Sequence, residues 1–276
     1  MLENKDSHKK ALEAIFGRER VYSDALDCFG YSYDAAPEAL NTDFTPDFVC
    51  KAHTTAEVSA LLKYANDNAI PVTTRGNGSG RSGGSIPVRG GIVLSLDEMD
   101  KIIELDEKNM MLRVQPGVLT KAVHDFCAAR DLYYPPEPSS YVYSTIGGNI
   151  AENAGGIRAV KYGVTSDYVM GLEVVLPGGD IIHTGGKLIK NVTGYNLTQL
   201  FVGSEGTLGV ITEATLKVIA KPKHLASAMA SFKSIEDACE AVNACLLSGV
   251  TPTAAELMDK LSCEAAARFN DFPLKD

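Results

Sequence analysis

The chain has 276 residues, of which 45% are hydrophobic and 22% charged, so it is long enough for one large globular domain or two modest ones. This composition excludes a disordered chain and a collagen-like repeat. The 35 acidic residues outnumber the 26 Lys and Arg residues, which gives a net charge of −9. Because nucleic acids and anionic membranes attract basic surfaces, we expect small molecules as ligands and no nucleic-acid partner.

The N-terminal residues are polar, and no stretch approaches the roughly 18 consecutive apolar residues that a membrane-spanning helix needs. We therefore expect a cytoplasmic protein with no membrane span. The six cysteines are scattered, with no C-x-x-C pair and no histidine at ligand spacing. This pattern favours buried, reduced thiols over disulfides or a metal site.

Residues 1–44 have a polar, helical pattern and form an arm before the first predicted strand. A β-α-β unit follows, with strand 48–52, a helix after a capping box from Thr54 to Glu57, and strand 70–74. Because a helix connects the two strands, they should be parallel.

Short strands, one helix and one hairpin are predicted in the middle of the chain. In chain order they are strands 91–96, 102–105 and 111–114, an amphipathic helix over 119–129, a turn-rich zone over 135–163, hairpin strands 172–176 and 180–183, and a long alternating strand over 209–219. The sequence pattern changes at Lys221-Pro222-Lys223, after which glycines are few, and this indicates a domain boundary. Strand 226–232, helix 235–247 and strand 254–258 then predict a second β-α-β unit.

Seven of the 25 glycines lie within residues 75–91. The run Gly78-Ser79-Gly80-Arg81-Ser82-Gly83 matches G-x-G-x-x-G, the fingerprint of NAD-binding Rossmann proteins. The residues after it, Gly83-Gly84-Ser85-Ile86-Pro87, cannot continue the helix that this fingerprint requires, and no acidic residue follows at the expected offset. We therefore reject the NAD interpretation. Small residues still let backbone amides approach a diphosphate, and Arg75 and Arg81 add positive charge, so the loop predicts an anion-binding nest rather than a simple turn.

Six runs of sequence resemble, in the right order, the motifs of the FAD-linked oxidase family, whose FAD-binding fold is of the vanillyl-alcohol-oxidase or p-cresol-methylhydroxylase (PCMH) type. The runs are IPVTTRGNGSG (70–80), YPPEP (134–138), TIGGNI (145–150), NAGG (153–156), VKYG (160–163) and GSEGTLGVIT (203–212). The resemblance covers about residues 45–276. Within the family, the chain most resembles the glycolate oxidase flavin subunit and the D-lactate and D-2-hydroxyglutarate dehydrogenases.

The resemblance implies an α+β fold in three parts. These are the N-terminal helical arm (1–44), a two-subdomain PCMH-type FAD-binding domain (45–221), and the start of an α+β, ferredoxin-like C-terminal cap domain (222–276). In the resembled dehydrogenases the cap carries the substrate cations, the base and a metal-binding His pair. We therefore assign no catalytic residue and no metal ligand in this chain, which we expect to be incomplete for catalysis.

By the same resemblance, three groups of residues hold FAD. The first cradles the diphosphate and comprises Thr74, Arg75, Gly76, Asn77, Gly78, Ser79 and Gly80. The second runs along the flavin and ribityl chain or closes the pocket, and comprises Pro138, Ser139, Thr145, Ile146, Gly147, Gly148, Asn149, Asn153, Gly155 and Gly163. The third holds the adenosine side or the isoalloxazine edge through backbone atoms, and comprises Glu205, Gly206 and Ile211. Many relatives attach FAD through a His near the first loop, but residues 76–85 contain none, so non-covalent FAD is expected.

Oxidation of a 2-hydroxy acid requires hydride transfer from the substrate Cα to flavin N5, a base for the hydroxyl proton and a cation for the carboxylate. The five histidines lie apart from other ligand-type side chains, which favours structural or solvated roles. A few polar residues remain pocket candidates without an assigned role: Arg75, Lys161, Lys187, Lys190, Asn191 and Tyr195.

The leading hypothesis is an FAD-dependent dehydrogenase of small 2-hydroxy acids. It would pass its electrons to an acceptor subunit, either an iron–sulfur protein or an electron-transfer flavoprotein. The alternative is a truncated or split-subunit FAD-binding module without independent catalysis.

Overall fold

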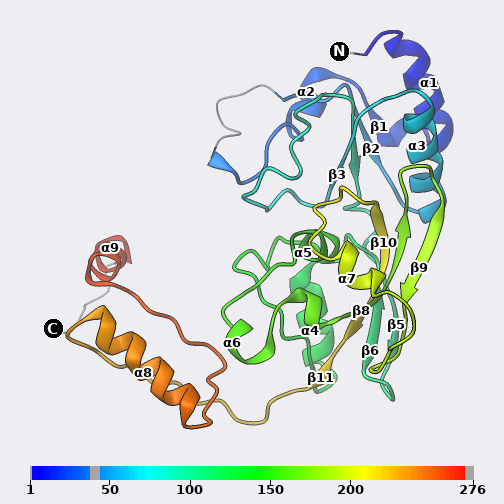
Figure 1. Ribbon diagram of the computed structural model, residues 1–276. Helices are drawn as coiled ribbons and strands as arrows, with labels where there is room; N and C mark the ends of the chain where they lie inside the picture. Colours follow the sequence, from blue (N-terminus) through cyan, green and yellow to red (C-terminus); the bar gives the residue numbers. More distant parts are fainter. Residues whose placement is uncertain (1, 38–43, 271–276) are drawn as a thin grey trace.

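The computed structural model describes residues 2–37 and 44–270 of the chain. Figure 1 shows two α+β lobes, one in blue and cyan and one in green and yellow, with a C-terminal segment in orange and red extending from the second lobe. Strands β8 (Val169–Val175), β9 (Ile181–Gly185) and β10 (Val210–Lys217) reach from the second lobe toward the first. Val175 and Val210, from these strands, pack into the hydrophobic core of the first lobe, so the two lobes form one body.

The first lobe contains a four-stranded sheet in the order β1-β2-β4-β3. Its elements are α1 (Lys5–Phe16), η1 (Arg18–Arg20), β1 (Val21–Tyr22), α2 (Ala25–Phe29), β2 (Phe48–Lys51), α3 (Thr55–Asp67), β3 (Val72–Arg75) and β4 (Ile92–Ser95). Strands β2 and β3 are both parallel to β4, which lies between them. The predicted parallel β-α-β unit is confirmed, with β4 inserted into it.

Helix α3 begins with the predicted capping box, in which Thr54 and Glu57 exchange hydrogen bonds. Helix α1, in the predicted arm, is packed onto the same lobe, since Leu12 and Phe16 are fully buried. Strand β1 also extends the sheet by pairing with β2. The first strand therefore comes earlier than predicted, because two residues carry no periodic signal.

The second lobe contains a five-stranded antiparallel sheet in the order β5-β6-β10-β8-β9. The strands are β5 (Ile102–Asp106), β6 (Met111–Val114), β8 (Val169–Val175), β9 (Ile181–Gly185) and β10 (Val210–Lys217), and a two-residue pair is formed by β7 (Leu132–Tyr133) and β11 (Ile219–Ala220). The helices are α4 (Thr120–Ala128), α5 (Ile146–Glu152), α6 (Ala159–Tyr162), η3 (Thr165–Asp167) and α7 (Leu197–Phe201). The predicted strands, the hairpin β8–β9 and the helix α4 are confirmed.

The zone predicted to be rich in turns, 135–163, contains two short helices. Helix α5 is capped by Thr145, whose Oγ1 accepts a hydrogen bond from the Gly148 N–H at 3.3 Å. Gly147 and Gly148 lie in its first turn. Because glycine has a low helix propensity, the local sequence does not predict this helix. The structure therefore places a helix where the sequence indicated only turns.

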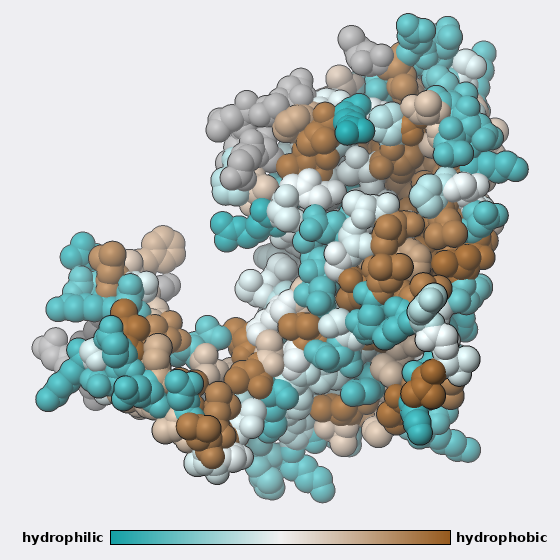
Figure 2. Space-filling model, viewed as in Figure 1, coloured by the Kyte–Doolittle hydropathy of each residue, from teal (hydrophilic) through white to brown (hydrophobic). Residues whose placement is uncertain are grey.

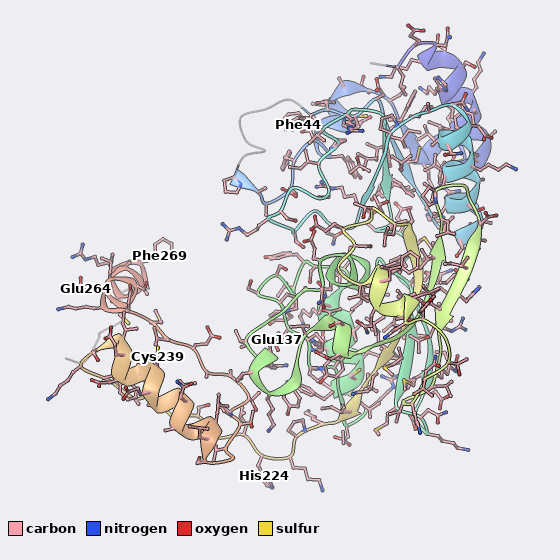
Figure 3. The ribbon with its side chains drawn as sticks, in the orientation of Figure 1. Phe44, Glu137, His224, Cys239, Glu264 and Phe269 are labelled. Atoms are coloured by element: carbon pink, nitrogen blue, oxygen red, sulfur yellow. The ribbon has the colours of Figure 1, made fainter. Side chains whose placement is uncertain are left out.

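The C-terminal segment contains α8 (Ile235–Leu247) and α9 (Lys260–Asn270). Helix α8 is confirmed, but the strands predicted over 226–232 and 254–258 are wrong. A strand needs a neighbouring strand for its hydrogen bonds, whereas a helix forms its bonds internally. Figure 2 shows brown apolar side chains open on the surface of this segment, and Figure 3 shows Cys239 and Phe269 lying on it, away from the two lobes.

The cysteines divide between the same two regions. Cys28, Cys50 and Cys127 are buried in the lobes, as expected of reduced thiols. Cys239 and Cys245 on α8 are exposed and Cys263 on α9 is partly exposed, which corrects the prediction for these three. Across residues 2–37 and 44–270, no helix is long and apolar enough to cross a membrane.

Candidate functional site

A cavity lies between the two lobes and encloses about 1200 Å³ of space free of protein atoms, counting its open mouth. Three stretches of chain supply most of its walls: the loop after β3, the region around α5, and the turn before β10. Residues 76–81 come from the first lobe, and the other two stretches come from the second. The cavity is thus built from segments that are far apart in the sequence.

The first wall is the glycine loop, which we define as residues 76–85. It leaves β3 without forming a helix, as predicted, and this agrees with the rejection of the NAD fingerprint. A Cβ on Gly76 would collide with the Thr145 hydroxyl, so the loop approaches α5 more closely than any other residue would allow. Asn77 Nδ2 donates to the Tyr143 carbonyl oxygen at 3.0 Å, which joins the loop to the second lobe.

The second wall is the start of α5. Gly147 packs on Pro116, and a Cβ at this position would lie 2.6 Å from the Pro116 Cβ. Asn149 is buried, and its Nδ2 donates to Thr120 Oγ1 at 2.6 Å. This buried hydrogen bond fixes α5 against α4, so the wall is rigid.

The third wall is the turn before β10. Glu205 has a φ of 52°, a left-handed conformation that non-glycine residues rarely adopt, and Gly206 next to it has a φ of 72°. The Glu205 N–H donates to the Ala151 carbonyl oxygen at 2.9 Å, which holds this turn against α5. Strained backbone of this kind persists where the surrounding structure enforces it, and it concentrates at functional sites.

Charged residues surround the cavity. Ser82 Oγ donates to both carboxylate oxygens of Glu152, at 3.0 and 3.1 Å. Glu152 and Glu205 both approach Gly84, since their carboxylate oxygens lie 3.2 and 3.8 Å from where its Cβ would be. Asp34, from the N-terminal region, is buried and also lines the cavity.

The structure brings many of the predicted residues together in this cavity. Those that line it are Thr74, Gly76, Asn77, Gly78, Ser79, Gly80, Thr145, Gly147, Gly148, Asn149, Glu205, Gly206 and Ile211. Those that do not line it are Arg75, Pro138, Ser139, Ile146, Asn153, Gly155 and Gly163. Ile146 is in the hydrophobic core, and Asn153 Oδ1 accepts a hydrogen bond from the Ser166 N–H at 2.9 Å. The side chains of Ile146 and Asn153 therefore contact other protein atoms and do not face the cavity.

Sequence reasoning missed several lining residues. They are Asp34, Gly84, Ser85, Leu96, Pro116, Ser140, Ser144, Ala151, Glu152, Ala154, Ser204, Gly209 and Val210, and the cavity also takes in Arg81, which was noted only for its charge. Ala154 and Ser204 lie inside the family motifs and Glu152 lies directly before one, so counting every residue in and next to the motifs would have predicted all three. Asp34 lies in the predicted arm, and no sequence signal marks it.

The remaining pocket candidates lie elsewhere. Lys187 forms an ion pair with Glu104, and Lys190, Asn191 and Tyr195 are exposed and outside the lining. Lys161 lies over the ring of Tyr162, 5.5 Å from its centroid.

None of the five histidines lines the cavity. His124 Nε2 is 2.8 Å from the Pro136 carbonyl oxygen, and burial lowers its pKa although this hydrogen bond opposes the shift. Across the described parts of the chain, no group of three or more His, Cys, Asp or Glu side chains is arranged to hold a metal ion.

Comparisons with known protein families match two parts of the chain. Residues 46–185 match the family described as FAD binding domain, and residues 221–276 match the family described as FAD linked oxidases, C-terminal domain. These matches confirm the family resemblance of the sequence motifs.

Individual relatives agree. Glycolate oxidase subunit GlcD of Bacillus subtilis is 44% identical over 91% of this chain and 53% of its own length. The D-lactate dehydrogenases of Anaerostipes hadrus and Archaeoglobus fulgidus are 41% and 42% identical, over 81% and 87% of this chain and 49% and 54% of their own lengths. The chain thus spans about half the length of the curated relatives that it matches.

Solved structures confirm the predicted fold class. A structure of alkyldihydroxyacetonephosphate synthase superposes with a TM-score of 0.79 at 25% identity, covering 91% of this chain and 47% of that protein. A structure of p-cresol methylhydroxylase with substrate bound superposes with a TM-score of 0.70 at 22% identity, covering 89% of this chain and 49% of that protein.

Proposed function

This chain belongs to the family of FAD-binding-domain proteins, and from that membership we propose that it is the flavin-binding part of an oxidoreductase acting on small 2-hydroxy acids. The observation that carries the proposal is the 44% identity to a glycolate oxidase subunit along 91% of the chain. The two D-lactate dehydrogenases, at 41% and 42% identity, support the same substrate class.

FAD is the cofactor of this family, and the cavity residues fit it. FAD combines a charged diphosphate with flat apolar rings. Gly76, Gly78, Ser79 and Gly80 line the cavity, and a run of such small residues leaves room for a diphosphate held by backbone amide groups. Leu96, Pro116 and Val210 supply apolar surface for a ring.

Each wall of the cavity has a role in this proposal. When bound, FAD supplies the flavin N5 position that accepts a hydride from the substrate Cα. Residues 76–80 hold the diphosphate through their backbone. The Asn77 side chain, by bonding to the Tyr143 carbonyl oxygen, keeps the loop of the first lobe closed on the second. The rigid start of α5 and the strained turn at Glu205 orient the remainder of the cofactor.

The protons and electrons of the reaction require further groups. By the family resemblance, we place the substrate base and the carboxylate-binding cations in the C-terminal domain, whose family match begins at residue 221. The Bacillus subtilis relative is a subunit of glycolate oxidase. This supports an electron-acceptor partner, either an iron–sulfur subunit or an electron-transfer flavoprotein.

A second candidate function is an FAD-binding module without catalysis of its own. The family match over residues 46–185 favours it, because an FAD binding domain requires the cofactor and no catalysis of its own. Both candidates predict a yellow protein with a flavin spectrum.

Anaerobic mixing with D-lactate, glycolate and D-2-hydroxyglutarate separates the two candidates. Bleaching of the visible flavin band by any of these acids supports the oxidoreductase. A stable flavin spectrum with all three, restored to turnover by adding the C-terminal half of a relative, supports the module. No flavin spectrum at all contradicts both.

The FAD should be bound non-covalently. Among the lining residues that the structure describes, none is His or Cys, the side chains through which flavins are commonly attached. Acid precipitation should therefore leave all the yellow colour in the supernatant, whereas a coloured protein pellet would contradict the prediction.

A further inference from the structure

Arg75 was expected to touch the cofactor, yet its side chain lies on the other side of the glycine loop. The residue ends β3, and only 7% of it is exposed. Its Nη1 donates to the Tyr33 carbonyl oxygen at 2.7 Å and lies 3.4 Å from Ser85 Oγ. The guanidinium also lies over the Tyr31 ring, 5.6 Å from its centroid. Arg75 therefore joins β3, the N-terminal stretch 31–36 and the far end of the glycine loop.

The loop is wrapped around this guanidinium. Gly78 has a φ of 63°, and a Cβ added there would collide with Arg75 Nη2. The Ala35 N–H donates to the Gly80 carbonyl oxygen at 3.0 Å, so stretch 31–36 is also bonded directly to the loop. Removing the guanidinium would leave a void beneath the backbone that faces the cavity.

The same contacts place Asp34 in the cavity wall. Its Oδ1 accepts a hydrogen bond from the Ala36 N–H at 2.7 Å, and its Oδ2 lies 3.5 Å from Ser85 Oγ. Burial lowers the pKa of Arg75, and the nearby Asp34 carboxylate opposes this shift. Arginine nevertheless stays charged in proteins. A buried cation therefore holds the loop and Asp34 in one arrangement.

We propose that Arg75 is a positioning residue for FAD, which fixes the backbone of residues 76–80 and carries Asp34 into the cavity wall without touching the cofactor. A planar guanidinium can bond to Tyr33 and Ser85 while it stacks on Tyr31, which an ammonium group cannot do. The inference rests on the FAD binding of the proposed function and is independent of the 2-hydroxy-acid substrate.

The test compares four variants of the full chain, each stripped of FAD and titrated with FAD while flavin fluorescence is followed. Arg75→Gln removes the positive charge and most of the N–H donors. Arg75→Lys keeps the positive charge but removes the planar guanidinium. Arg81→Gln removes an exposed cation that lines the cavity on the same loop. Arg20→Gln breaks a partly buried pair with Glu57 in the same lobe, 2.6 Å between Nη2 and Oε1, away from the cavity.

We expect Arg75→Gln to raise the Kd for FAD about 10- to 100-fold, the usual effect of losing a buried hydrogen bond from a charged group. Arg75→Lys should raise it about 10-fold, because the charge remains but the planar fork is lost. Arg81→Gln removes a charge from the cavity lining and should also raise the Kd, but by less than Arg75→Gln does, because the lost charge is exposed. Arg20→Gln should lower the melting temperature and leave the Kd unchanged. The visible circular dichroism of bound flavin should change in both Arg75 variants and stay unchanged in Arg20→Gln.

Two results would overturn the proposal. One is an Arg75→Lys variant that binds FAD as tightly as the unsubstituted protein, since charge alone would then suffice. The other is an Arg75→Gln variant that loses stability as Arg20→Gln does but keeps its FAD affinity and flavin dichroism. If Arg75→Gln does not fold, the Arg75→Lys variant alone decides between the two outcomes. Failure of the unsubstituted protein to bind FAD would instead refute the proposed function.

Discussion

The two-lobed body and the C-terminal segment have similar local sequence patterns but very different packing. In the body, side chains such as Leu12, Phe16 and Ile146 are fully buried. In the segment 222–270, helix α8 has no buried residue, and Met229 is 96% exposed. Both regions were predicted to contain β-α-β units, but only the first forms its strands.

The difference shows which interactions each kind of element needs. Helix α8 forms because its hydrogen bonds join residues four apart, and Ser234 caps its start by accepting from the Asp237 N–H at 3.1 Å. The predicted strands beside it have no neighbouring strand within the described residues to pair with. Periodicity therefore predicts a helix more reliably than it predicts a strand whose partner lies elsewhere.

The largest expected contrast is between two phenylalanines. Phe16 on α1 is fully buried and Phe269 on α9 is 90% exposed. Phe16→Ala should destabilise the protein by about 3–5 kcal/mol, since it opens a cavity in the core. Phe269→Ala should change stability by less than about 0.5 kcal/mol. Urea unfolding measures both, and equal effects would contradict the division into body and segment.

A smaller effect is expected at the cavity wall. Gly147→Ala should cost about 1–3 kcal/mol and weaken FAD binding, because the new methyl group would lie 2.6 Å from the Pro116 Cβ and displace α5. Gly178, in the β8–β9 turn, has open space around it, so Gly178→Ala is the matched control and should be neutral. Thermal unfolding with and without FAD checks both. FAD binding that is unchanged in Gly147→Ala would show that this wall is not needed.

The third contrast depends on pH. Burial raises the pKa of Glu57, but hydrogen bonds from Arg20, His53 and Thr54 outweigh it, so the pKa is lowered on folding. The stabilisation by Glu57 is then complete above the unfolded-state pKa of about 4.3 and is lost as the pH falls through the lower folded-state value.

Glu57→Gln should therefore cost about 1 kcal/mol at neutral pH and flatten the fall in stability below about pH 4.3. Glu240→Gln, on the exposed α8, is the control and should leave the acid profile unchanged. Urea unfolding at a series of pH values measures both. A Glu57→Gln variant with the acid profile of the unsubstituted protein would contradict the assignment.

The smallest effect is expected from cutting the segment itself. Lys223 and Lys233 lie in exposed, irregular chain, so limited trypsin treatment should cleave there early. Because this segment buries little against the lobes, the cleaved body should keep its FAD and unfold within about 0.5 kcal/mol of the intact chain. A large loss of stability would mean that the segment is packed on the body.

Much of the cavity lining could be predicted from motifs rich in small residues. The glycines of the first loop and of TIGGN were recognised because few other sequences place so many small residues together, and they do line the cavity. Pro138 and Ser139 were predicted by the same resemblance and lie outside the lining. Whether each of these residues contacts FAD stays a prediction, as do the boundaries of the three proposed domains.

The sequence by itself determined the family, the cofactor and the elements that local signals encode, such as the capping box of Thr54 and Glu57. Only the tertiary structure decided the direction of the Arg75 side chain, the place of Asp34 in the cavity wall and the failure of the C-terminal strands to form. Each of these depends on contacts between segments that are distant in the sequence. The local sequence specifies the hydrogen bonds within a helix or turn, because they join residues that are close in the chain. Burial and strand pairing depend on the whole fold.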